Sequence, residues 1–171
     1  MRPHQASLSN HPGQRQQPAL LTAIGRAEGP LWLGRRRLEK YVGLCVAISG
    51  GAHGLVTPAH FQEWWGYGVF FLVASVCLIG FGLALITDAI DPRYMPGDVH
   101  RLRRLMYLAG AVGNVSIIAL YVLSRTIGVP LGPNGGSVES VGGVDLVAKT
   151  TEILAVAGLV VLLLKTRRIV D

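Results

Sequence analysis

The sequence predicts an all-α fold, a four-transmembrane-helix bundle, on the basis of three observations. Half of the 171 residues are hydrophobic and only 15% are charged, which is typical of integral membrane proteins. The hydrophobic residues gather in four stretches, each close to the length that a helix needs to cross the hydrocarbon layer. Nearly all Lys and Arg residues lie outside these stretches, in segments that fall on one side of the membrane.

The four predicted spans cover about residues 41–57, 66–87, 104–123 and 144–164. The first is the shortest uninterrupted run, and we predict a span there because basic residues precede it and Thr57-Pro58 follows it. Between the first two spans we expect a short helical or interfacial segment. Pro58 suits the first turn of such a helix and Thr57 suits its cap.

The basic residues predict the orientation. Seven lie at or before Lys40, four lie between the second and third spans, and three follow the fourth span. Because cationic loops stay on the cytoplasmic side, both termini should be cytoplasmic. The net charge of +6 then follows from the topology and from contact with anionic lipid, so a nucleic-acid partner is not expected.

The domain organisation follows from composition. Residues 1–29 lack hydrophobic periodicity, and residues 1–36 are expected to form a disordered, basic cytoplasmic tail, whereas residues 37–168 form the four-helix membrane domain. The tail offers no apolar core typical of a cleavable signal peptide. Cys45 and Cys77 fall inside the first two spans, where packed thiols are expected and a disulfide is not.

The last span carries charge. Asp145, Lys149 and Glu152 are spaced by four and three residues, which places them on one stripe of a helix. A charge inside a span costs at least a few kcal/mol, about 2.5–3.5 by insertion scales, unless it is paired, hydrated or bound to a ligand. The stripe is therefore either an internal ladder of ion pairs or part of a functional site.

The first two spans add further polar groups. His53 lies about one turn from the outer end of the first span, with Ser49 on the same face. In the following segment His60, Glu63 and Tyr67 are spaced by three and four residues, so they would share a face of one continuous helix. A His-x-x-Glu pair on a helix can bring an imidazole and a carboxylate to the same metal.

The third span carries Asn114, Tyr121 and Arg125, which are spaced by seven and four residues and form another single stripe. Arg125 is the only arginine expected on the outer side. It precedes a segment with regularly placed Gly and Pro, which favours a fixed turn that folds back over the bundle. We expect Arg125 to pair with Asp145 or Glu139.

The leading hypothesis is a transition-metal site that faces outward. Nitrogen and oxygen ligands without thiolate suit Fe, Zn, Mn or Cu(II). The predicted metal ligands are His53, His60 and Glu63, with Asp145 or Glu152 completing the set. The residues expected to orient these ligands or contact a substrate are Arg125, Lys149, Tyr67, Asn114 and Tyr121. Such a site would serve redox chemistry or metal handling, and no enzymatic reaction is assigned.

Three segments, 60–68, 124–133 and 145–152, resemble those of small four-helix integral membrane proteins of actinobacteria. The first reads His60-Phe61-Gln62-Glu63-Trp64-Trp65-Gly66-Tyr67-Gly68. The resemblance covers the chain from about Tyr41 onward. It implies a multi-pass protein of the bacterial plasma membrane and supplies neither a reaction nor a functional residue.

Two alternatives stay open. Buried Asp, Glu, Lys and His arranged by depth are also what a small-solute or proton transporter or sensor requires. The chain could also be a non-catalytic accessory subunit whose charged residues pair with a membrane partner or with a second copy. Haem is disfavoured, because only His53 is clearly intramembrane and a bis-His site needs a second histidine.

Overall fold

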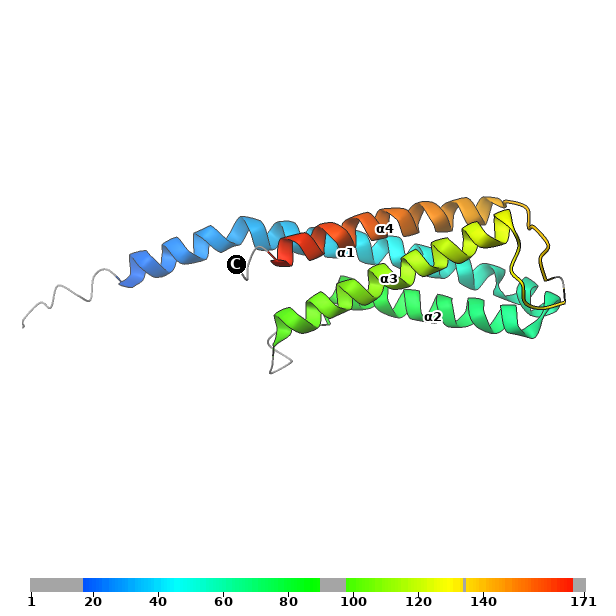
Figure 1. Cartoon of the computed structure of the whole chain (residues 1–171). Coiled ribbons are helices and arrows are strands. Elements are labelled where there is room, and N and C mark those ends of the chain that lie inside the picture. Colours follow the sequence, from blue (N-terminus) through cyan, green and yellow to red (C-terminus); the bar gives the residue numbers. More distant parts are fainter. Residues whose placement is uncertain (1–16, 90–97, 134, 168–171) are drawn as a thin grey trace, which may run out of the picture. The chain divides into compact units, whose positions relative to one another are not determined.

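The computed structural model describes residues 17–89, 98–133 and 135–167, and the side chains of these except 17–33 and 167 (Figure 1). The helices are α1 (Gln17–Glu63), α2 (Trp65–Thr87), α3 (Val99–Thr126) and α4 (Gly143–Arg167). The chain divides into two compact units, Met1–Arg36 and Arg37–Asp171. The described residues of the first unit are helical, but most of the predicted tail lies outside the residues whose side chains are described.

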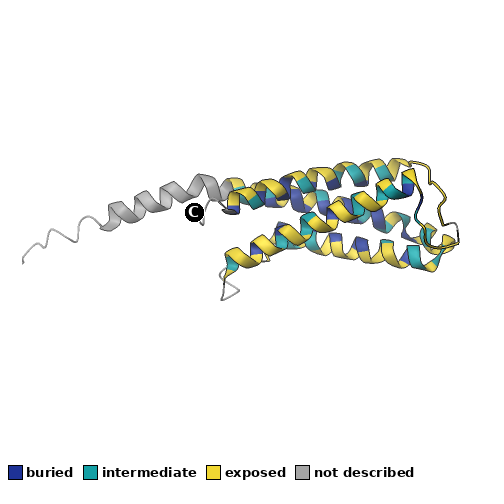
Figure 2. Cartoon of the chain, viewed as in Figure 1, coloured by how far each residue is buried: buried dark blue, intermediate teal, exposed yellow. Residues whose placement is uncertain are grey.

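Within the described residues, four helical segments are long and apolar enough to cross a membrane: Gly34–Glu63, Trp65–Thr87, Val99–Thr126 and Gly143–Thr166. The all-α class and the four-helix prediction are confirmed. Many large apolar side chains are exposed, among them Leu55 at 77% and Val76 at 63%. Figure 2 shows exposed positions along all four helices. An apolar surface of this extent suits contact with lipid, which indicates a multi-pass membrane protein.

Helices α1 and α2 pack in close backbone contact. A Cβ atom added at Gly43 would lie 2.7 Å from the carbonyl oxygen of Gly82, and one added at Gly82 would lie 2.6 Å from that of Gly43. Two turns away, the Ser75 hydroxyl donates to the carbonyl oxygen of Gly50 at 2.8 Å. Small residues allow this approach, as they do in other membrane helix pairs.

The remaining contacts close the bundle. The Phe81 ring of α2 lies against Gly110 of α3, Val42 of α1 lies against Gly158 of α4, and α3 and α4 run side by side (Figure 1). The core cluster is apolar apart from the hydroxyl of Tyr107. Its buried members are Val42, Val46, Leu78, Leu85, Tyr107, Ala155, Leu159 and Leu162.

Helix ends differ from the predicted ones. Pro58 lies inside α1, which continues to Glu63, so residues 58–63 extend the first helix and do not begin a second one. The fixed φ of proline is compatible with a helix, although its ring removes one backbone donor and crowds the carbonyl group four residues before it. The helical conformation is interrupted at Trp64, whose backbone is extended. Helix α3 begins at Val99, and the side chain of the preceding Asp98 accepts from the Arg101 amide at 3.0 Å.

Candidate functional site

A cavity of about 250 Å³ lies at the end of the bundle where α1 ends and α2 begins. All four helices and the segment between α3 and α4 contribute to its wall, which is predominantly apolar. The polar and charged residues that line it are His53, His60, Tyr67, Tyr121, Ser124, Arg125, Glu139, Asp145 and Lys149. Most of the polar residues singled out in the sequence, but not Asn114, therefore gather at one end of the bundle.

Glu152 is the fully buried acid behind this wall, with 0% exposure. One carboxylate oxygen, Oε1, accepts from the Ser49 hydroxyl and contacts Nε2 of His53, both at 2.8 Å. The other oxygen lies 2.5 Å from Nζ of Lys149. Three partners from α1 and α4 thus satisfy a charge that would otherwise be costly inside a span.

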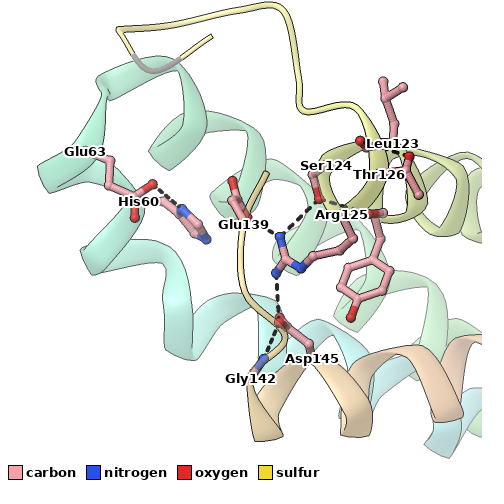
Figure 3. Close-up of polar contacts among 10 residues, drawn as sticks. His60, Glu63, Leu123, Ser124, Arg125, Thr126, Glu139, Gly142 and Asp145 are labelled. Atoms are coloured by element: carbon pink, nitrogen blue, oxygen red, sulfur yellow. Dashed lines mark hydrogen bonds and ion pairs between the residues drawn. The ribbon is translucent and has the colours of Figure 1, made fainter. Parts of the chain in front are cut away.

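Arg125 joins three segments of the chain. Its guanidinium lies between Glu139 and Asp145 and pairs with both, and Nη2 is 2.8 Å from Oδ2 of Asp145 (Figure 3). Nη1 also donates to the Ser124 hydroxyl at 3.1 Å, and Asp145 accepts from the Gly142 amide at 2.9 Å. The expected pairing is confirmed with both acids, because the planar guanidinium offers donors in two directions.

Tyr121 connects the two charged groups. The Arg125 guanidinium carbon lies 4.8 Å from the ring centroid, and Nζ of Lys149 lies 5.0 Å from it. Both distances fall in the range of cation–π attraction. Asp145 pairs with Arg125, whereas Lys149 pairs with Glu152. The three charged residues of α4 therefore do not form a single internal ladder of ion pairs.

His60 and Glu63 form a separate pair near the mouth of the cavity. Nδ1 of His60 lies 3.0 Å from Oε2 of Glu63, and Figure 3 shows this pair apart from Arg125 and Asp145. The Phe71 ring stacks on His60 with centroids 3.9 Å apart, and it contacts His53 at 5.4 Å. Because α1 ends before Trp64, Tyr67 belongs to α2 and does not continue the helical face of His60.

The segment between α3 and α4 forms the outer boundary of the cavity. The Tyr67 hydroxyl donates to the carbonyl oxygen of Leu131, and the Glu139 amide donates to the Ser124 carbonyl at 3.2 Å. Gly132 has φ of +80°, a value that favours glycine, and its backbone lies against Tyr67. These contacts confirm the expected fold-back over the bundle.

The five predicted metal ligands are distributed over different pairs. His53 contacts Glu152, His60 contacts Glu63, and Asp145 contacts Arg125. Within residues 34–89, 98–133 and 135–166, no group of three or more His, Cys, Asp or Glu side chains could hold a metal ion. The structure thus brings the ligands to the same end of the bundle without assembling them around one point.

Asn114 lies away from the cavity wall. It is 1% exposed on α3, and its amide group donates to the Gly110 carbonyl at 2.9 Å. Two helical turns separate it from Tyr121, so the stripe predicted on this span is correct in direction but reaches below the cavity.

Sequence reasoning missed a second buried polar cluster, at the end of the bundle where α2 ends and α3 begins. Arg103 pairs with Asp88 at 3.0 Å and lies 3.9 Å from Glu39, and Glu39 accepts from the Tyr107 hydroxyl. Arg103 and Tyr107 are spaced by four residues on one face of α3. That spacing could have indicated a polar face on α3. The acidic partners could not be identified from it, because they come from α1 and the end of α2.

Comparisons of this chain with protein-family models, with curated proteins and with solved structures find no match.

Proposed function

We propose that this chain is a membrane protein that binds a small, largely apolar solute in the cavity between the ends of its four helices. The observation that carries the proposal is the cavity itself, to which every helix and the segment after α3 contribute. Concave, mostly apolar sites with a few fixed polar groups are the usual form of small-molecule sites, and bundles place them between their helices.

The size of the cavity limits the solute. A cavity of about 150 Å³ accepts benzene, and drug-sized ligands occupy about 300–1,000 Å³. At about 250 Å³ the present cavity fits a molecule somewhat larger than a single aromatic ring. Its polar wall groups already bond to one another, so they would orient the ligand and the apolar wall would supply most of the affinity.

The rest of the bundle favours binding or sensing over conduction. Below Glu152, the side chains of Val46, Ala155 and Leu159 are fully buried and apolar. They separate the cavity from the cluster around Arg103 at the opposite end. A solute that enters the cavity therefore meets a packed apolar core, as expected of a receptor or of a transporter closed on that side.

The experiment measures thermal stabilisation of the purified chain in detergent by benzyl alcohol. Ala148 is buried and lines the cavity, so Ala148→Leu fills it, whereas Ala157→Leu adds the same volume to an exposed position of α4. We expect benzyl alcohol to stabilise the wild type and Ala157→Leu in a saturable way, and not to stabilise Ala148→Leu. Equal responses of all three proteins would show partition into the micelle and would overturn it.

The orientation is part of the proposal. The basic residues favour cytoplasmic termini, which places the cavity and the α1–α2 connection on the outer side of a bacterial plasma membrane. Reporter fusions after residue 166 test it. A cytoplasmic reporter should be active and a periplasmic one inactive, and the reverse result would turn the cavity toward the cytoplasm.

Metal binding is the second candidate. It is favoured by one observation: His53 and His60 line the same cavity, and each contacts a carboxylate, as metal-bound histidines commonly do. Elemental analysis after reconstitution should find metal in the wild type and in His100→Ala, but not in His53→Ala or His60→Ala. A redox-active metal would open oxidoreductase chemistry, and metal-free wild type would remove this candidate.

A further inference from the structure

We infer that the solute of this cavity is a small organic cation, such as a protonated amine on an apolar body. The inference rests on the proposed function and adds the charge of the ligand. Three features of the wall lead to it: the balance of its charged groups, the aromatic rings between them, and the way its two basic side chains are already engaged.

The charged groups of the site are unevenly matched. Among the described residues that line the cavity or bond directly to its lining, four are carboxylates and two are Lys or Arg. The carboxylates are Glu63, Glu139, Asp145 and Glu152, and the basic side chains are Arg125 and Lys149. The site stays negative unless both His53 and His60 carry protons. A monocation would reduce this excess, and its attraction to Asp145 and Glu152 would be stronger than to the exposed Glu63 and Glu139, because charge interactions weaken toward solvent.

The aromatic wall suits an organic cation. His60 and Phe71 are stacked, and Trp64 meets Tyr67 edge to face with centroids 5.1 Å apart. All four line the cavity. Aromatic faces attract ammonium groups and also contact an apolar body, which is how proteins recognise amines and quaternary ammonium ligands.

An anionic ligand fits less well. Lys149 is bonded to Glu152 and Arg125 is bonded to Glu139 and Asp145, so an anion would compete with a carboxylate already bound to either basic side chain. A bare metal ion is also less suited, because the described side chains form no group of three or more ligands and the wall is largely apolar. An organic cation needs no group of three or more ligands, and its apolar body suits the apolar wall.

The test compares three probes of nearly equal shape, benzylamine, benzyl alcohol and benzoate, at neutral pH. Binding is followed through Trp64 in a variant with Trp32→Phe and Trp65→Phe. We expect benzylamine to bind about tenfold more tightly than benzyl alcohol, as one added cation–π and charge contact would give, and benzoate to bind least.

The variant Glu63→Gln with Glu139→Gln removes two charges from exposed positions, and we expect benzylamine and benzyl alcohol to bind this variant with equal affinity. Asp98→Asn removes a charge near the start of α3 and should leave the preference intact. Equal affinities of the wild type for the amine and the alcohol, or a preference for the amine that survives the double substitution, would overturn the inference of a cationic ligand. The proposed binding of a solute in the cavity would then still stand. Binding of none of the three probes would overturn the proposed function as well.

Discussion

His53 and Glu152 lie in contact across α1 and α4, with Nε2 of the imidazole 2.8 Å from Oε1 of the carboxylate. Their exposed fractions are 5% and 0%. The same oxygen accepts from Ser49, one helical turn before His53. This contact ties the first helix to the last at the floor of the cavity, so the wall of the proposed site and the stability of the bundle depend on the same carboxylate.

Removal of that carboxylate should destabilise the bundle. Glu152→Ala leaves Lys149 and His53 without their partner in a buried setting, and we expect a loss of about 3–5 kcal/mol in the free energy of unfolding. Chemical unfolding in detergent measures it. The control is Glu63→Ala, which removes a half-exposed acid and should change stability by less than about 1 kcal/mol. Similar losses in the two variants would argue against the buried charge network.

The two-carboxylate bridge of Arg125 should hold the segment that follows α3. Lysine carries a single ammonium group and cannot reproduce the planar fork, so Arg125→Lys should release Glu139 or Asp145. We expect hydrogen exchange at the Glu139 amide to rise about tenfold, as for the loss of one hydrogen bond to a charged group. Arg104→Lys, at an exposed position of the same helix, should leave that exchange rate unchanged. Unchanged exchange in both variants would show that the bridge does not anchor the segment.

The contact of α1 with α2 predicts different effects of one substitution at two glycines of the same helix. Gly82→Ala would place a methyl group 2.6 Å from a backbone oxygen of α1, and we expect a loss of about 1–3 kcal/mol as the helices separate. Gly80→Ala meets no atom within 4 Å and should be neutral or stabilising by up to about 1 kcal/mol. Thermal unfolding of the two variants decides the point, and the opposite order would contradict the packing.

The cluster at the other end of the bundle predicts a role for the Tyr107 hydroxyl. Tyr107→Phe removes the donor to Glu39 without changing the buried ring, so we expect a loss of about 1–3 kcal/mol. Tyr41→Phe alters a 69% exposed ring of α1 and should have no effect on unfolding. Equal stability of both variants with the wild type would mean that the hydroxyl contributes nothing to the cluster.

Much of the fold follows from the sequence because lipid imposes a length and a polarity on each span. The four helices were predictable for this reason, and the sequence predicted that Arg125 pairs with Asp145 or Glu139, whereas the structure shows both pairs. The ends were less predictable. Hydropathy marks the apolar part of a helix, whereas α1 and α3 continue through polar residues such as His60 and Arg103. These two side chains are stabilised by contacts with residues outside their own helix.

The site was predictable as a set of residues but not as an arrangement. Helical spacing placed Lys149 beside Glu152. It could not reveal that Phe71 lies against both histidines or that Trp64 breaks the helix between His60 and Tyr67, because both depend on how α1 and α2 meet. Contacts between helices determine which polar side chains lie next to one another. These contacts cannot be read from a single sequence.

If the cavity binds an organic cation from the outer side, position 148 should be accessible from that side. In a chain whose Cys45 and Cys77 are replaced by Ala, Ala148→Cys places a thiol on the cavity wall, and Ala157→Cys places one on an exposed face of α4. Intact cells are treated with a membrane-impermeant thiosulfonate that carries an ammonium group. We expect the Ala148→Cys protein to be modified at a rate that benzylamine lowers, and the Ala157→Cys protein not to be modified. Modification of Ala148→Cys only after the cytoplasmic side is opened, or at a rate that benzylamine does not change, would contradict it.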